Sequence, residues 1–140
     1  MATSTVERRP WSAEVPAAGS IRTFLLIQSA TFLSAAAFHS GVFSPGFAHG
    51  AAAIAESVIA TVLLGGLLAT WIRPRSVRGI ALAVQSFGLI GTFVGLATIA
   101  VGIGPRTVPD LVLHGVMVIE LASGLVVAVR ARVRHAEVSP

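Results

Sequence analysis

Four long apolar stretches limit what this chain can fold into more than any other feature of its sequence. They cover residues 21–41, 51–72, 79–103 and 111–129. Each is long enough to cross the hydrocarbon core of a bilayer, which takes about 20 residues of helix. Apolar residues make up 54% of the 140 residues and charged residues only 11%, and so small a soluble domain could not bury that much apolar surface. We therefore predict an all-α fold, an integral membrane four-helix bundle in contact with lipid.

Turn-forming and charged segments separate the four predicted spans. They are SPGF at 44–47, RPRSVR at 73–78 and GIGPRTVPD at 102–110. Pro109 and Asp110 favour a helix start, because proline suits the first turn and an acid suits the positive end of the helix dipole. The predicted organisation is a polar tail at 1–20, a four-helix transmembrane domain at 21–130 and a second tail at 131–140.

The placement of arginine predicts the orientation in the membrane. All ten basic residues are arginine. Nine of them lie before or at the start of the first span, join the second span to the third, or follow the fourth: Arg8, Arg9, Arg22, Arg73, Arg75, Arg78, Arg130, Arg132 and Arg134. The other two connections carry only Arg106. By the positive-inside rule, we predict a multi-pass protein of the cell membrane with both termini and both tails in the cytoplasm.

Composition also excludes several classes of function. The chain has no cysteine, so disulfides, thiolate metal sites and cysteine nucleophiles are excluded. It has no lysine, which excludes a Schiff base to a carbonyl cofactor. The arginines form short clusters next to the spans and not a basic face, so we expect no nucleic-acid partner.

Two short sequence matches suggest that the bundle consists of two duplicated helical hairpins. IQSATFL at 27–33 matches VQSFGLI at 84–90, and HGAAAIAES at 49–57 matches HGVMVIELA at 114–122. A duplication of this kind would make His49 equivalent to His114, Glu56 to Glu120 and Gln28 to Gln85. Apolar segments built from few residue types also match by chance, so the duplication is a hypothesis for the structure to examine.

Three histidines are predicted to lie at the extracytoplasmic end of the bundle. His39, His49 and His114 belong to three different spans or to their junctions, and Glu56 and Glu120 follow deeper in two of these spans. Acidic groups inside a membrane are costly unless they face the bundle interior, and they are functional by default. Each residue also has an ordinary structural explanation. His39 and His49 suit helix ends, and His114 suits a hydrogen-bonded interior position.

The chemistry of these side chains predicts a cofactor or metal site. Imidazole and carboxylate together suit copper, zinc or iron, so His39, His49, His114, Glu56 and Glu120 are the candidate metal ligands. Two of the three histidines could instead hold haem b as axial ligands, with alanine and glycine beside His39 and His49 leaving room for the macrocycle. A third possibility is proton or cation movement, with the glutamates loading and unloading and the histidines as relays.

A second set of residues is predicted to serve helix packing. Gln28 and Gln85 are interhelical hydrogen-bonding groups in the simplest interpretation, and Gly91 with Gly95 forms a small-xxx-small pattern that lets helices approach closely. The glycine-rich third span could pack inside the bundle or against another membrane subunit or a second copy of the chain.

These observations lead to one functional hypothesis and two alternatives. The first is a binding or electron-transfer subunit of a larger membrane complex, holding a metal or haem, and not a complete enzyme, because no separate substrate domain is present. The second is a structural accessory subunit that docks by its third helix. The third is a small ion-coupled transporter.

Overall fold

The computed structural model describes residues 14–43 and 45–131, which form four long helices. These are α1 (Glu14–His39), α2 (Gly50–Ile72), α3 (Val77–Ala100) and α4 (Val108–Arg130), with short 3-10 turns η2 (Pro45–Phe47) and η3 (Pro74–Ser76) between them. All four are long and apolar enough to cross a membrane. The described residues contain no strand, and the predicted all-α four-helix membrane bundle is confirmed.

The first helix starts earlier than the sequence analysis expects. The predicted span begins at residue 21, whereas α1 begins at Glu14 and so includes part of the predicted tail at 1–20. Pro16 does not prevent this, because a first-turn residue has no intrahelical partner for its backbone N–H. Residues 1–13 and 132–140, with the predicted tail residues Arg8, Arg9, Arg132 and Arg134, lie outside the described residues.

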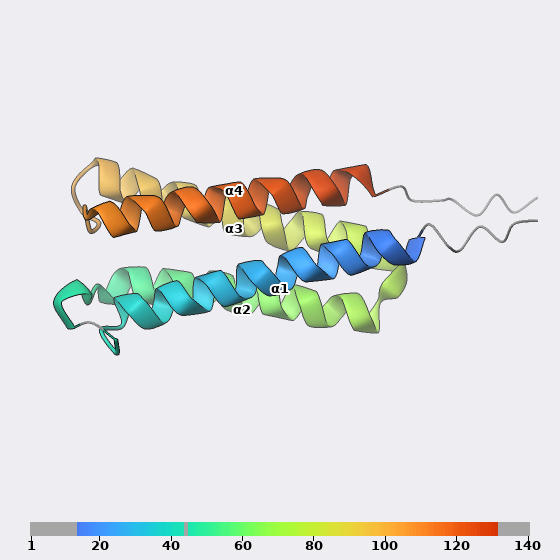
Figure 1. Ribbon diagram of the computed structural model, residues 1–140, viewed down its shortest axis with the longest axis horizontal. Helices are drawn as coiled ribbons and strands as arrows, with labels where there is room; N and C mark the ends of the chain where they lie inside the picture. The colour runs from blue at the N-terminus through green and yellow to red at the C-terminus, as the bar shows by residue number, and fades with distance from the viewer. Residues whose placement is uncertain (1–13, 44, 132–140) are drawn as a thin grey trace, which may run out of the picture.

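The helices are arranged as two antiparallel hairpins that pack side by side (Figure 1). α1 and α2 form one hairpin, α3 and α4 the other, and α1 and α3 lie diagonally opposite each other. We call the end where α1 ends and α2 begins the distal end. Both distal connections turn through a glycine with positive φ, Gly41 at +82° and Gly102 at +85°, a conformation that side chains other than glycine rarely adopt.

The bundle is apolar on its outside as well as at its centre. Leu25, Leu63 and Leu121 are fully buried between the helices. Isoleucines such as Ile54, Ile90 and Ile119 are more than 60% exposed on the outer faces of three helices. A surface this apolar is typical of a protein that contacts lipid, so we describe the chain as a multi-pass membrane protein.

The two glutamines of the predicted packing set meet at the centre of the bundle. Gln28 Nε2 donates a hydrogen bond to Gln85 Oε1 at 3.0 Å and another to the Glu120 carbonyl at 2.8 Å. Gly124 leaves the space for this contact, because a Cβ there would collide with both amide groups. The helices therefore approach closely at the level where these polar groups need partners.

Buried positions recur with the same spacing in α2 and α4. The corresponding pairs are Glu56 with His114, Ile59 with Met117, Leu63 with Leu121, Gly66 with Gly124, and Thr70 with Ala128. Arg22 and Arg78 correspond in the same way, because each donates to the carbonyl of the last of these pairs, at 2.9 and 3.2 Å. The two hairpins are thus alike in their buried pattern.

The pairing of residues differs from the one that the sequence matches suggest. His49 precedes α2 as its N-cap, whereas His114 lies inside α4, so these two residues are not equivalent. Glu56 corresponds to His114 and not to Glu120. The physical reason is that two residues are structurally equivalent when they occupy the same position on the buried face of their helices. The short sequence matches align residues that occupy different positions on these faces.

Candidate functional site

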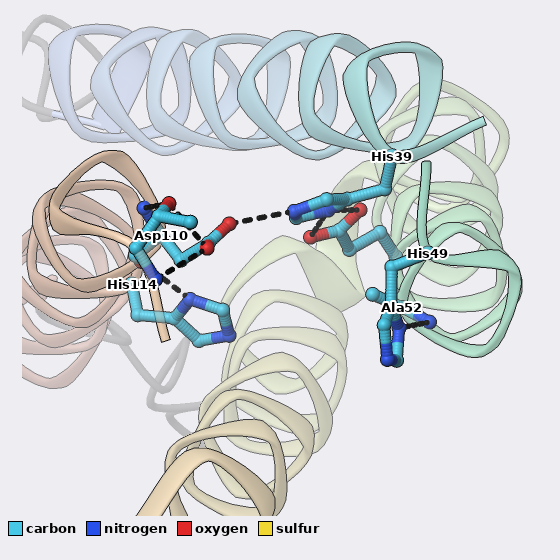
Figure 2. A network of polar contacts seen from close by, with 7 residues as sticks. His39, His49, Ala52, Asp110 and His114 are labelled. Atoms are coloured by element: carbon cyan, nitrogen blue, oxygen red, sulfur yellow. Dashed lines mark hydrogen bonds and ion pairs between the residues drawn. The ribbon is translucent and has the colours of Figure 1, made fainter. Parts of the chain in front are cut away.

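A histidine held between two carboxylates forms the centre of the candidate site, at the distal end (Figure 2). His39 Nδ1 lies 2.8 Å from both carboxylate oxygens of Glu56, and its Nε2 lies 2.9 Å from Asp110 Oδ1. His39 is 1% exposed, Glu56 5% and Asp110 2%. We call these three residues the distal triad. They belong to α1, α2 and α4, so only the folded bundle can assemble them.

Local structure positions each member of the triad. His39 is the last residue of α1, and its carbonyl accepts the His49 backbone N–H at 2.8 Å, which ties the start of α2 to the end of α1. Asp110 lies in the first turn of α4 in a capping box with Thr107. Its Oδ2 accepts the Thr107 N–H at 3.0 Å and the Thr107 hydroxyl. The same carboxylate therefore caps a helix and binds His39.

The geometry of the triad sets how many protons it holds. Carboxylates only accept hydrogen bonds, and a neutral imidazole has a single N–H. His39 contacts a carboxylate at each ring nitrogen, so each contact needs a proton between nitrogen and oxygen. Two protons shared among an imidazole and two carboxylates leave one net negative charge on the triad. Asp110 also accepts from Thr107, whereas Glu56 accepts only from His39 among the described residues, so Glu56 is the carboxylate that more readily takes up the shared proton.

From the sequence, Asp110 is expected only to start a helix, and it is not among the predicted site residues. One signal for its inclusion is present in the sequence. Asp110 precedes His114 by four residues, one helical turn, at the bundle end where the other histidines gather. An acid within a turn of an intramembrane histidine is a candidate partner for any imidazole nearby.

His49 lies close to this site but outside the triad. Its Nδ1 accepts the Ala52 backbone N–H at 3.3 Å and so caps α2. Because Nδ1 accepts, the ring proton of neutral His49 is on Nε2. His49 therefore acts as a helix-start residue, one of the two roles that its sequence position suggests.

His114 presents a free lone pair. Its Nδ1 lies 2.8 Å from the Asp110 carbonyl, which can only accept, so in the neutral ring the proton is on Nδ1 and Nε2 is an acceptor. His114 is 8% exposed, and no residue in the described part of the chain bonds to its Nε2. In Figure 2 the ring lies beside the contact between Asp110 and His39, and no dashed line joins it to His39. A Cβ at Gly95 would lie 2.9 Å from Nε2, so this glycine makes room for the ring.

A cavity of about 180 Å³ lies beside the triad, between α2, α3 and α4. Glu56, His49 and His114 line it together with Thr92 and Thr98. The rest of the lining is apolar, with Phe32, Ile59, Ile99 and Met117 as its larger side chains. The site thus combines a buried proton-holding triad with an adjoining apolar space.

Glu120 does not join the site. Its Oε1 accepts from the Thr31 hydroxyl at 3.2 Å, and its Oε2 is buried without a hydrogen-bond partner. Among the described residues no basic side chain pairs with it. It lies closer to the middle of the bundle than the triad, one turn beyond Met117.

Three glycines of α3, Gly88, Gly91 and Gly95, contact neighbouring helices inside the bundle. A Cβ at Gly91 would lie 2.7 Å from Ile59 Cδ1 in α2, and Gly88 faces Leu121 of α4. The sequence leaves open whether this glycine-rich face packs inside the bundle or against another subunit. At Gly88 and Gly91 the structure has packing inside the bundle.

The predicted metal ligands are brought together only in part. Within residues 14–43 and 45–131, no group of three or more histidine and acidic side chains is placed to hold a metal ion. Both His39 ring nitrogens are already hydrogen-bonded, so a metal or haem iron could bind His39 only by displacing a carboxylate. Metal or haem binding stays a prediction.

No protein-family model, curated protein or solved structure matches this chain.

Proposed function

We propose that this protein is a small ion-coupled membrane transporter, with the distal triad as its proton site. The observation that carries the proposal is the position of His39 between two carboxylates, which obliges three buried residues to share two protons. A buried group with a mobile proton and a net charge inside a membrane protein is typical of a proton relay.

The cavity supplies the second part of the proposal. Glu56 shares one of the two protons of the triad with His39 and also lines the cavity. A solute or water in the cavity therefore contacts the same carboxylate that exchanges the proton with His39. Occupancy of the cavity and protonation of Glu56 then affect each other, which is the thermodynamic requirement for coupling.

Proton flux into liposomes tests this function. Purified protein is reconstituted around a trapped pH-sensitive dye, and a potassium gradient with valinomycin drives proton entry. We expect pH-dependent entry that Glu56→Gln reduces to the level of protein-free liposomes, because glutamine cannot exchange a proton. Glu120→Gln is the matched control, since Glu120 contacts Thr31 away from the cavity. Wild-type entry equal to that of protein-free liposomes at every pH would refute the proposal.

Metal or haem binding is the second candidate, and one observation favours it. His49, His114 and Glu56 line a single cavity, and His114 Nε2 carries the free lone pair that a metal ligand needs. A haem would need more room, because pockets for ligands of that size usually measure about 300–1,000 Å³. Elemental analysis of the purified protein and its absorption spectrum test this candidate, and near-stoichiometric metal that His114→Ala removes would support it.

A further inference from the structure

The polar groups that line the cavity are almost all hydrogen-bond acceptors. His114 Nε2 has a lone pair, and Glu56 is a carboxylate that faces the same space. The Thr92 and Thr98 hydroxyls donate their protons to carbonyls of their own helix, at 2.9 and 2.7 Å, which leaves their oxygens as acceptors. His49 supplies a donor at Nε2 when its ring is neutral. A molecule in this cavity is therefore best matched when it donates hydrogen bonds.

Charge favours a cation among such donors. The distal triad carries one net negative charge, and its carboxylates and imidazole are almost completely buried. Glu56 and His114 line the same cavity, so both acceptors lie next to this charge. A buried negative charge without a counter-ion is costly in a low-dielectric interior, and a bound cation removes that cost.

The remaining lining favours an organic cation over an inorganic one. Phe32, Ile59, Ile99 and Met117 offer no oxygen or nitrogen to replace the hydration shell of a small inorganic ion. Hydrocarbon, in contrast, gains free energy when it leaves water for such a surface. The volume of about 180 Å³ admits a small molecule, since a water molecule occupies about 30 Å³ in the liquid.

We infer that the cavity binds a small organic ammonium ion, whose N–H groups donate to Glu56 and to His114 Nε2 and whose hydrocarbon part contacts Phe32 and Met117. The inference rests on the proposed function in one respect, because the ammonium ion uses the carboxylate that exchanges the proton. Small organic ammonium ions would then be the substrates of the proposed transporter.

Binding of three probes to protein in lipid nanodiscs tests the inference. Benzylammonium has the charge, the N–H donors and an apolar body, benzyl alcohol keeps the body without the charge, and tetramethylammonium keeps the charge without N–H. The readout is the ¹⁵N chemical shift of the His114 ring, with empty nanodiscs as the background. We expect a saturable shift with benzylammonium and at least about tenfold weaker binding of the other two, as loss of a charge-assisted hydrogen bond implies.

Substitutions inside and outside the cavity test whether the probe binds there or elsewhere on the bundle. Gly95→Ala places a Cβ 2.9 Å from His114 Nε2, whereas Gly79→Ala on the same helix meets nothing within 4 Å. We expect Gly95→Ala and Glu56→Gln to weaken benzylammonium binding about tenfold or more, and Gly79→Ala and Glu120→Gln to leave it unchanged. Thermal unfolding of each variant checks that it folds. If Gly95→Ala does not fold, Glu56→Gln still tests the inference.

The outcomes distinguish this inference from the proposed function. Benzylammonium binding without proton flux in liposomes would leave the inference standing and refute transport. Flux that depends on Glu56, combined with equal binding of benzyl alcohol and benzylammonium, would refute the ammonium site and leave transport standing. Unchanged binding in both Gly95→Ala and Glu56→Gln would also overturn the inference, because the ligand would then lie elsewhere.

Discussion

At the scale of single residues, the two carboxylates of the distal triad differ in the number of groups that they hydrogen-bond. Within the described part of the chain, Glu56 hydrogen-bonds only to His39, whereas Asp110 accepts from His39 and from both the N–H and the hydroxyl of Thr107. Asp110 therefore links the proton site to the start of α4. Glu56 has no second structural partner among the described residues, which suits a group whose protonation changes.

This difference predicts the stability of two amide variants. Asp110→Asn should lower the free energy of unfolding by about 1–3 kcal/mol, because an amide has one acceptor oxygen and its NH₂ would face donors. Glu56→Gln should cost less than about 1 kcal/mol, because its amide can serve the single His39 contact. Unfolding in mixed micelles with increasing dodecyl sulfate measures both. The explanation fails if Glu56→Gln is the more destabilising variant.

At the scale of helices, glycine decides how closely the two hairpins approach. Gly124 of α4 lies against Gln28 and Gln85, and Gly91 of α3 lies against Ile59 of α2. These contacts place backbone next to Gln28 and Ile59 of the opposite hairpin, where a methyl group has no space. The central glutamine pair depends on them, because hydrogen bonds across a bundle require a fixed separation of the helices.

A matched pair of glycine substitutions tests this role. Gly124→Ala should destabilise the bundle by about 1–3 kcal/mol, because it separates the buried amides of Gln28 and Gln85. Gly65→Ala, on the lipid-facing side of α2 where nothing lies within 4 Å, should be neutral or stabilising by up to about 1 kcal/mol. The same micelle titration measures both variants. Equal effects would show that the contact at Gly124 is unimportant.

At the scale of the whole molecule, the arrangement of the hairpins places the candidate site at one end. η3 lies at the opposite end from η2 and the triad, next to the starts of α1 and α3 (Figure 1). Arg22 and Arg78 lie near that same end, where they contact the last turns of α2 and α4. The orientation predicted from the arginines would place the triad and the cavity near the outer surface of the cell membrane.

Single-cysteine labelling tests this orientation, and the chain is well suited to it because it contains no cysteine. Gly46→Cys and Ser76→Cys replace exposed residues at the two opposite ends. We expect a membrane-impermeant maleimide to label Gly46→Cys in intact cells and Ser76→Cys only after the membrane is opened. The reverse pattern would place the termini outside and contradict the positive-inside prediction.

The amino-acid sequence by itself determined that the chain forms four membrane-length helices and where their connections lie. Hydrophobic length and the positions of Pro, Gly and Arg are local properties, and the cost of burying polar backbone in lipid acts on each segment separately. Small errors arose at helix ends. α1 begins at Glu14 because a first-turn proline such as Pro16 does not stop a helix.

Only the tertiary structure decided which polar residues meet. His39 and Glu56 come together with Asp110, while Glu120 bonds Thr31 and His49 caps its own helix. These outcomes depend on the rotation of each helix about its axis and on its offset along that axis. Both are set by packing contacts such as Gly124 against the glutamine pair. A shift of one residue turns a side chain by about 100°, so residue order alone does not specify the contacts.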